Sequence, residues 1–398
     1  MIRYLTAGES HGAALIGIVE GMPAGVPLTT DDINEHLARR WLGFGRGGRA
    51  RIEQDRVEIL SGVRFGKTMG SPIALRLENA AHHKDRSDWP NVMAIGGSGE
   101  GIEPVTLPRP GHADLAGAQK YRFDDIRPVI ERASARETAM RVACCSVARV
   151  MLRHLEIEMG SHVVRIGNVG YGDSGAWQER VAAVLEEGGA RAVYKAADKS
   201  EVRMLDAELS DAAIAHIKEI KTAGDSLGGA YEVIATGVPV GLGSYVHWDR
   251  KLDGRLAQAI LSIQGQKAVE IGDGFAAGST PGSQFHDPIT EDEQGHHLTR
   301  GSNREGGIEG GVSNGMPIIV RGVMKPIPTL VKPLETVDIS TGEAQPTRYE
   351  RSDVTSVPAA STVAEATVAW VLAAALLERY GGDTFEQVEQ RLTLDAAT

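Results

Sequence analysis

"GESHGAALIGIVEGMPAG", residues 8–25, returns later in the chain as "GDSLGGAYEVIATGVPVG", residues 224–241, without a gap and at an offset of 216 residues. A second pair, "VEILSGVRFGKTMGS" (57–71) and "VEIGDGFAAGSTPGS" (269–283), aligns at an offset of 212. Gly, Ser, Ile and Pro recur at matching places. The repetition predicts an internal duplication, with two βαβ-like halves related by a pseudo-twofold axis. Chance matching of glycine-rich turns is the alternative.

Apolar and β-branched residues around these stretches predict the elements of each half. Thr29 or Thr30 can cap a helix that has acids in its first turn and arginines in its last. The expected elements are, in chain order, strands at 2–6 and 13–20, two strands within 57–79, a long helix over about 134–155, one strand and three helices over 156–223, then strand, helix, strand, and an Ala/Leu-rich helix over about 358–380.

These elements are expected to form one α+β domain over residues 1–398, in which sheets and helices are layered as a βαβ sandwich. The two halves span about 1–155 and 224–380, and a variable segment, 156–223, lies between them.

The composition is ordinary for a globular protein. The net charge of −11 does not favour binding to nucleic acid. Cys144 and Cys145 are adjacent in an apolar helical pattern, which indicates reduced core thiols in a cytosolic protein. The sequence shows no signal peptide, and the apolar run 366–377 is too short to cross a bilayer. We therefore expect a cytoplasmic protein with no nucleic-acid, membrane or metal partner.

Ser10 lies in Gly-x-Ser-x-Gly, the pattern of a hydrolase nucleophile elbow. That elbow needs several strands before it, and Ser10 has at most one. Ser10 recurs as Ser226, whereas His11 is replaced by Leu227. The serine turn is therefore predicted to be shared scaffold, and His11 to be the candidate for chemistry.

Two glycine-rich segments leave alternatives open. "GYGDSG" (170–175) fits either a dinucleotide-binding turn or, as we favour, a plain turn from strand to helix. "RRWLGFGRGGRAR" (39–51) fits an anion clamp, a solvated loop or an RGG-like nucleic-acid segment. We favour the clamp, because the segment has five arginines and no lysine, and arginine binds carboxylate and phosphate through two hydrogen bonds.

Further polar residues fall in four short motifs. "RPGHAD" carries His112, and "RASAR" places Arg132 and Arg136 on one face of a starting helix, with Ser134 near its N-terminus. "MKPIPTL" is a proline-braced turn with one lysine, and "RSD" (351–353) couples an acid to an arginine. Two histidines, one acid and many arginines suit acid–base chemistry on a small polyanion.

Eight motifs together, among them "GESHGAALIGIVEGMP", "RRWLGFGRGGR", "RPGHAD", "ERASARET" and "RSDVTSVPA", resemble the chorismate synthases over about residues 1–380. The resemblance implies a homotetramer of βαβ-sandwich protomers that binds reduced FMN. It also implies conversion of 5-enolpyruvylshikimate 3-phosphate into chorismate and phosphate by a trans-1,4 elimination. A separate NADPH-dependent reductase is expected to regenerate the flavin.

The resemblance also implies residue roles. His11 would protonate the reduced flavin, His112 the departing phosphate, and Asp353 would work with flavin N5 as the base. Gly265 stands where alanine is common in the family, which puts that flavin contact in doubt. The substrate's anionic groups would be held by Arg40, Arg46, Arg49 and Arg136. The flavin site would be lined by Arg132, Ala133, Ser134, Gln264, Gly265, Gly310, Lys325, Pro326, Ile327, Pro328, Thr329 and Arg351.

Residues 80–110 are polar and rich in Gly and Pro, which predicts a long mobile loop that orders when ligands bind. Two rival classes remain at this stage. A nucleic-acid-binding module would bind through residues 39–51 with a steep salt dependence. A flavin oxidoreductase would consume NADPH in proportion to its product.

Overall fold

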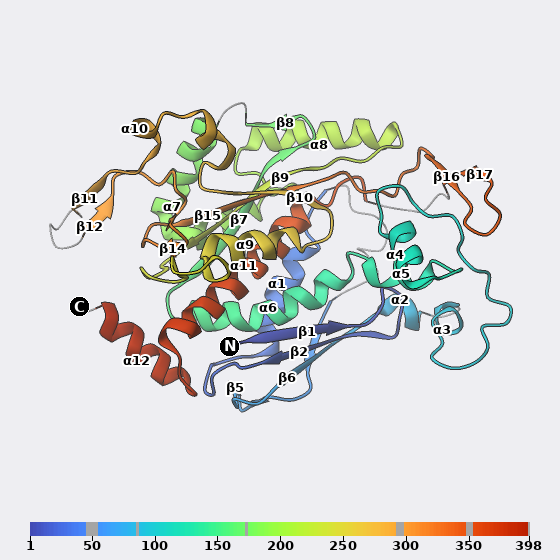
Figure 1. Cartoon of the computed structure of the whole chain (residues 1–398), viewed down its shortest axis with the longest axis horizontal. Helices are drawn as coiled ribbons and strands as arrows, with labels where there is room; N and C mark the ends of the chain where they lie inside the picture. The colour runs from blue at the N-terminus through green and yellow to red at the C-terminus, as the bar shows by residue number, and fades with distance from the viewer. Residues whose placement is uncertain (45–54, 85–86, 172–173, 292–297, 348–352, 397–398) are drawn as a thin grey trace.

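A computed structural model of the chain describes residues 1–44, 55–84, 87–171, 174–291, 298–347 and 353–396. Two antiparallel sheets enclose a layer of helices, and further helices cover the outer side of the second sheet (Figure 1). The first sheet has the order β1-β2-β6-β3 and the second β10-β15-β9-β7-β8. The strands are β1 (Arg3–Ala7), β2 (Ala14–Glu20), β3 (Val57–Ile59) and β6 (Ile73–Glu78), then β7 (Glu158–Ile166), β8 (Val169–Gly170), β9 (Gly229–Thr236), β10 (Gln266–Ile271) and β15 (Ile318–Met324).

The order of elements repeats between the two sheets. Read from β1, the first runs β1-β2-β6-β3; read from β7, the second runs β7-β9-β15-β10. β2 and β9 lie within the two copies of the repeated stretch, and each is the second strand in the order of its sheet. A cross-strand pair of opposite charges also recurs. Glu58 of β3 lies opposite Arg76 of β6, and Glu270 of β10 lies opposite Arg321 of β15. The strand orders of the two sheets thus match, while the duplication into two halves and the axis that would relate them stay predictions.

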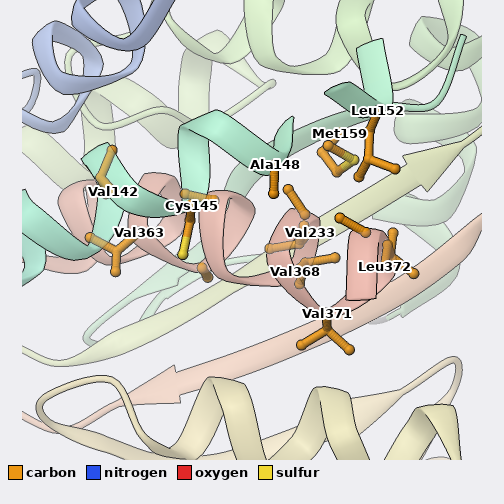
Figure 2. Close-up of a cluster of buried hydrophobic side chains, with 14 of the residues drawn as sticks. Val142, Cys145, Ala148, Leu152, Met159, Val233, Val363, Val368, Val371 and Leu372 are labelled. Carbon is orange, nitrogen blue, oxygen red and sulfur yellow. The ribbon is translucent and has the colours of Figure 1, made fainter. Parts of the chain in front are cut away.

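The helices between the sheets form the core. α6 (Glu137–His154) packs on β1 and β2 of the first sheet, and α11 (Val357–Tyr380) packs on β7 and β9 of the second. Figure 2 shows Val142, Cys145 and Ala148 of α6 facing the apolar side chains of α11. Burial raises the pKa of the Cys145 thiol to about 12. The expected core position of the two cysteines and the expected Ala/Leu-rich helix are both confirmed.

α1 (Thr30–Arg40) joins these layers. It begins at the predicted cap: the Thr29 hydroxyl accepts from the Asp32 backbone N at 3.3 Å, and the Asp32 carboxylate accepts from the Thr29 backbone N at 2.9 Å. It ends with two arginines that point to different partners.

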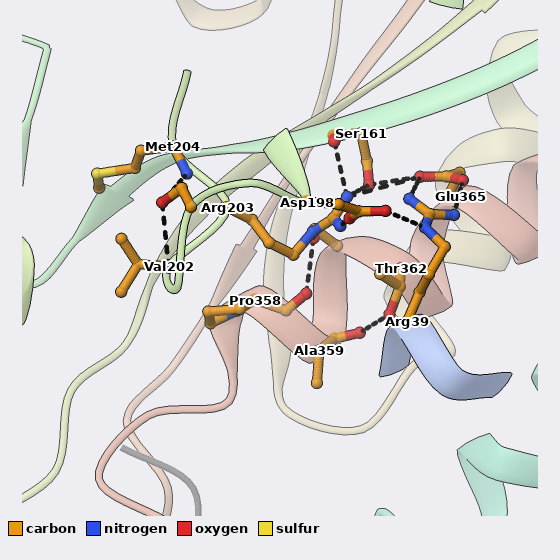
Figure 3. A network of polar contacts seen from close by, with 12 residues as sticks. Arg39, Ser161, Asp198, Val202, Arg203, Met204, Pro358, Ala359, Thr362 and Glu365 are labelled. Carbon is orange, nitrogen blue, oxygen red and sulfur yellow. Dashed lines mark hydrogen bonds and ion pairs between the residues drawn. The ribbon is translucent and has the colours of Figure 1, made fainter. Parts of the chain in front are cut away.

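The first of them, Arg39, enters a buried ionic network (Figure 3). Arg39 Nη1 donates to Glu365 of α11 at 2.6 Å and Arg39 Nε to Asp198 at 2.6 Å. Ser161 of β7 donates to the same Glu365 carboxylate at 2.7 Å, and Arg203 donates to the Ser161 carbonyl at 2.8 Å. The network ties α1, β7 and α11 together. It therefore fixes the position of the C-terminal end of α1, and with it the position of Arg40, the last residue of the helix.

The variable segment covers the outer face of the second sheet. It holds β7, β8, α7 (Ser174–Ala197) and α8 (Ala207–Thr222), and α7 is broken at Gly188 and Gly189. The two parts of α7 and α8 match the three expected helices. β7 pairs with antiparallel neighbours, whereas a dinucleotide-binding unit needs a parallel βαβ crossover. The segment at 170–175 therefore fits a turn from strand to helix, and its residues 172–173 lie outside the described residues.

Several elements were not predicted because they are too short for a periodic pattern. The expected loop at 80–110 contains two helical turns, α2 (Ala80–His83) and α3 (Trp89–Val92), with Pro90 in the first turn of α3. α9 (Leu252–Leu261) is the helix that was expected between β9 and β10, whereas the longer α12 (Phe385–Ala396) was not predicted. The remaining short elements are α4 (Asp114–Tyr121), α5 (Arg127–Ala133), α10 (Gly282–Phe285), the 3-10 turns Trp248–Arg250 and Gly274–Ser279, and the hairpins β4 (Val63–Arg64) with β5 (Lys67–Thr68), β11 (Ile289–Glu291) with β12 (Leu298–Arg300), β13 (Ile308–Glu309) with β14 (Val312–Ser313), and β16 (Glu335–Val337) with β17 (Ala344–Pro346).

α11 is longer than the apolar run 366–377 from which the sequence predicted a segment too short to cross a bilayer. The helix continues through Glu365, so it is long and apolar enough to cross a membrane, the one such helix in the ranges that the structure describes. The apolar window is 83% buried inside the protein, because the arginines of the ionic network neutralise Glu365 within the core. α11 is therefore a core helix.

Candidate active site

His11 lies in the first repeated turn, between β1 and β2, and Glu131 of α5 holds it. The Glu131 carboxylate accepts from the His11 backbone N at 2.8 Å and lies 3.0 Å from ring Nδ1. Trp89 of α3 stacks on the imidazole, with ring centroids 3.8 Å apart and planes 13° apart. Burial raises the pKa of Glu131, but the hydrogen bonds and charge of His11 outweigh that effect and lower it overall.

Ser10 and its repeat Ser226 are buried structural links. Ser134 donates to the Ser10 hydroxyl at 3.1 Å, and the Ser10 backbone N donates to the Glu131 carbonyl at 3.0 Å. Ser226 donates to the Ile327 carbonyl at 2.7 Å. Each serine fastens its turn to a neighbouring segment, as expected for shared scaffold.

His112 forms a second imidazole–carboxylate pair, with Asp114 at the start of α4. The ring Nδ1 contacts Asp114 Oδ1, and Arg109 Nε donates to the other carboxylate oxygen at 2.8 Å. The Asp114 carboxylate is fully buried. Burial raises the pKa of Asp114, but His112 and Arg109 together hold it well below its usual range. Asp114 was missed from the sequence, although it lies two residues from His112 in "RPGHAD".

Arg40 and Arg136 converge on one buried carboxylate, Asp55. Arg40 Nη1 lies 3.5 Å from Asp55 Oδ2, and Arg136 Nη1 bonds to Oδ1. Arg136 Nε donates to Asn79 Oδ1 at 2.8 Å, and Asn79 Nδ2 donates to the Gly12 carbonyl at 2.7 Å. Asn79 thus joins the arginine pair to the His11 turn. Neither Asn79 nor Asp55 was predicted, and the predicted Arg46 and Arg49 lie outside the described residues.

The expectation that Arg132 and Arg136 share one helix face is wrong. Ser134 is extended, with φ −61° and ψ 143°, and it separates α5 from α6. Arg132 therefore lies in the last turn of α5, and Arg136 immediately precedes the first residue of α6. Arg132 bonds back to the first strand, donating to the Thr6 carbonyl at 2.9 Å.

Gln264 borders a hollow of about 410 Å³. Its Nε2 donates to Glu137 at 3.1 Å, while its buried Oε1 has no hydrogen-bond partner among the described residues. Gly265 has φ +81°, where alanine would be strained, and its carbonyl accepts from the Lys325 backbone N at 2.9 Å. The hollow is lined by Tyr4, Leu5, Thr6, Arg132, Glu137, Arg141 and Gln264.

Residues 325–329, which follow β15, connect the rest of the site. Lys325 Nζ bonds to the Gly111 carbonyl next to His112, and Arg109 donates to the Thr329 hydroxyl at 3.4 Å. A Cβ at Gly111 would lie 3.5 Å from Pro328. The segment therefore links Gly265 on one side to the His112 loop on the other.

Asp353 lies beside the second repeated turn. Ser356 donates to its carboxylate at 3.2 Å, and the adjacent Val354 carbonyl accepts from the Leu227 backbone N at 2.8 Å. Ser226, next to Leu227, bonds to residue 327, so Asp353 joins the same set of contacts. Arg351 lies outside the described residues.

Gly310 is not brought to the other predicted residues. It forms a tight turn with Gly311, with φ +60° and +93°, between β13 and β14. In Figure 1 β14 lies far along the long axis from α4 and α5, which flank the two histidines.

Apart from Gly310, the described site residues form one continuous set of contacts. Two imidazoles are each paired at Nδ1 with a buried carboxylate, and the segments in contact with their loops carry guanidinium and ammonium groups. Such an arrangement binds an anionic ligand and exchanges protons with it.

The chain is similar in sequence and in fold to known proteins of one family. The family profile described as chorismate synthase matches residues 2–377. The chorismate synthase of Salinibacter ruber is 62% identical over 400 residues, covering 100% of this chain and 99% of the relative. That of Chlorobaculum tepidum is 55% identical over 394 residues, covering 98% and 97%. A solved structure titled "Crystal Structure of Chorismate Synthase" superposes with a TM-score of 0.76 at 42% identity, covering 98% of this chain and 96% of that one.

Proposed function

This chain belongs to the chorismate synthase family, and we propose that His11, His112 and Asp353 move the protons of its reaction. The reaction is the trans-1,4 elimination of phosphate from 5-enolpyruvylshikimate 3-phosphate, which gives chorismate in the shikimate pathway. The enzyme is therefore a carbon–oxygen lyase of aromatic amino-acid biosynthesis. The observation that supports these residue roles is the pairing of each histidine, through Nδ1, with a buried carboxylate.

Each of the three residues has a distinct part in the proposal. The His11 imidazole holds a proton for the cofactor, and His112 gives a proton to the phosphate as it leaves. Asp353 takes part in removing the proton from the substrate ring. A positioned proton donor contributes roughly 10²- to 10⁴-fold to a rate.

The anionic groups of the substrate bind to arginines in the proposal. Arg40 and Arg136 both contact the Asp55 carboxylate, and their guanidinium groups are proposed to bind a phosphate or carboxylate of the substrate. Arg46 and Arg49 belong to the same glycine-rich segment as Arg40 and are proposed to complete the clamp.

The family uses a reduced flavin, and we propose FMN. When bound, the reduced flavin supplies electron density for breaking the C–O bond, with no net redox change. The described residues fit such a group: the unpartnered, buried Gln264 Oε1 is an acceptor for a ring N–H, and Arg132 lies on the same hollow. The other residues proposed to hold it are Ala133, Ser134, Gly265, Lys325, Pro326, Ile327, Pro328, Thr329, Arg351 and, from another protomer, Gly310.

We also propose a homotetramer. The β13–β14 turn lies far from the two histidines within one protomer, so Gly310 would reach the flavin of a neighbouring copy. The outer face of the first sheet carries Leu5, which is 70% exposed. Light scattering is expected to give four chains per particle, and a monomer at assay concentration would contradict this.

Two further proposals concern evolution and location. The two halves are proposed to be related by an approximate twofold axis, supported by the matching strand orders. In a crystal structure β2 and β9 should superpose together with their neighbouring strands.

The enzyme is proposed to be cytoplasmic, without nucleic-acid or membrane partners, supported by its two buried free cysteines and its net charge.

The decisive experiment is anaerobic chorismate formation from 5-enolpyruvylshikimate 3-phosphate with dithionite-reduced FMN and no other protein. A parallel sample contains oxidised FMN and NADPH. We expect product only in the first sample, because the reductase is proposed to be separate. Product in both would show an intrinsic reductase, and product in neither would overturn the proposed cofactor.

A further inference from the structure

Glu131 makes more contacts with His11 than a helix residue needs for packing. A single carboxylate, 1% exposed, accepts from the His11 backbone N at 2.8 Å and pairs with ring Nδ1 at 3.0 Å. The backbone carbonyl of Glu131 also accepts from Ser10 N at 3.0 Å. The backbone bonds fix the turn, whereas the bond to Nδ1 fixes the ring.

We propose that Glu131 is the positioning residue of His11: it holds the proton on Nδ1, so that Nε2 is the nitrogen that exchanges a proton in the reaction. The carboxylate accepts hydrogen bonds only, so the neutral imidazole must keep its proton on the bonded nitrogen. The inference rests on the proposed catalytic role of His11.

Trp89 holds the ring from its face. The indole and imidazole are nearly parallel at 3.8 Å, and the Arg127 guanidinium lies 5.6 Å from the same indole. Glu131 fixes the ring within its plane and Trp89 fixes its tilt. The two contacts together leave His11 one orientation.

Among the described residues, the charged and titratable groups around His11 come from α5, from α2 and from its own turn. Both Glu131 and Arg127 belong to α5, and Arg127 Nη1 lies 4.0 Å from Glu131 Oε1. His82 of α2 contacts the His11 carbonyl at 2.9 Å through Nδ1, and Glu9 lies in the same turn. Within the described part of the chain Glu131 is the carboxylate in contact with the ring, so removing its charge disfavours the imidazolium form.

Trp89 provides a signal for the protonation of His11 that does not depend on catalysis. A protonated imidazole in contact with an indole quenches its fluorescence. The chain has five tryptophans, so the Trp89 signal is the difference between the wild type and Trp89→Phe. Titrating this difference against pH in the full-length enzyme gives the midpoint for His11.

Glu131→Gln keeps the shape and an acceptor oxygen but removes the charge. We expect the fluorescence midpoint to move to lower pH by about one unit or more. Turnover with pre-reduced FMN should fall roughly 10-fold or more with little change in KM, because substrate binding does not involve Glu131. Asp114→Asn is the matched control: it removes the carboxylate of the other histidine and should leave the Trp89 midpoint in place.

An unchanged midpoint in Glu131→Gln would overturn the inference. Because that variant could fail to fold, ¹⁵N-histidine NMR of the wild type provides a second test. The signal that disappears in His11→Asn should show the neutral ring protonated on Nδ1, and protonation on Nε2 would overturn the inference. Full turnover in His11→Asn would instead overturn the proposed role of His11, whatever the fluorescence shows.

Discussion

The side chain of Lys325 bonds to the backbone carbonyl of Gly111, one residue before His112. This bond joins the segment after β15 to the loop that carries the second histidine. The same lysine is tied through its backbone N to the Gly265 carbonyl at 2.9 Å. Lys325 thus links Gly265, which is proposed to contact the flavin, to the loop of His112, which is proposed to protonate the leaving phosphate.

Lys325→Met should therefore affect both the proposed flavin contacts and the loop that carries His112. The Gly111 carbonyl loses its donor, so we expect flavin affinity and turnover each to fall roughly 10-fold, about the value of a charged hydrogen bond. Flavin titration by absorbance and anaerobic turnover measure the two effects. Lys332→Met, at an exposed position nearby, is the control and should be near wild type. Equal behaviour of the two variants would contradict a linking role for Lys325.

His11→Ala should lower turnover by roughly 10²-fold or more, the usual scale for losing a positioned proton donor. Flavin and substrate should still bind, because the arginines supply most of the anion affinity. Ser10→Ala should cost far less, since Ser10 is buried against Ser134. Both variants are assayed with pre-reduced FMN. A dead Ser10→Ala beside a nearly normal His11→Ala would reverse the assignment.

Asn79→Ala should weaken both the fold and substrate binding. It leaves the Gly12 carbonyl and Arg136 Nε without a buried partner, which costs about 1–3 kcal/mol of unfolding free energy. The KM for the substrate should rise, because Arg136 loses its anchor. Urea unfolding and steady-state kinetics measure the two effects. Asn91→Ala, at an exposed site, should change neither; a wild-type KM in Asn79→Ala would argue against the link.

Glu365 should make stability depend on acid pH. Burial raises its pKa, but Arg149, Arg39 and Arg203 lower it overall to far below the usual range. The unfolded glutamate has a pKa of about 4.3, so this stabilisation is complete above that pH. It is lost as the pH falls further towards the pKa of the folded state.

Glu365→Gln should remove that acid dependence and lower the unfolding free energy at pH 7 by about 3–5 kcal/mol, because three buried arginines lose a charged carboxylate partner. Chemical unfolding from pH 3 to 7 measures both. Glu378→Gln, in the same helix, removes an exposed pair with Arg255 and should cost at most about 1 kcal/mol. Similar losses in the two variants would contradict a structural role for the network.

Protease cutting within residues 80–110 should slow sharply when flavin and substrate are both bound. Trp89 in this segment contacts His11, so closure of the site should also hold the segment. Limited proteolysis with and without ligands, followed by mass spectrometry, gives the rates. Equal rates would rule out a role as a lid.

Features set by neighbouring residues were predictable from the sequence. The Thr29 cap, the core helix at 357–380 and the adjacent buried cysteines depend on local pattern. The His11 turn was found because its repeat lacks the histidine. Arg132 and Arg136 were misplaced because a spacing of four predicts one face only if the helix is continuous, and the extended Ser134 interrupts it.

Residues whose partners are distant in the chain were not predictable. Asn79 acts through residues 12 and 136, and Asp55 through residues 40 and 136. No sequence pattern marks a polar side chain that becomes buried only when such segments meet. Asp114 and Glu131 were within the quoted motifs, and an acid at short helical or turn spacing from a histidine is the signal that could have revealed Asp114.

α11 also bears on how the chain is made. Every strand of both sheets precedes Val357, so each sheet leaves the ribosome before the helix that fills the space between them. Until Tyr380 has been synthesised, the faces of β7, β9 and α6 that α11 covers are exposed to water and to other proteins. Folding of the first half during translation is therefore incomplete, and a truncated chain that ends before α11 should aggregate or be degraded rather than persist as a folded half.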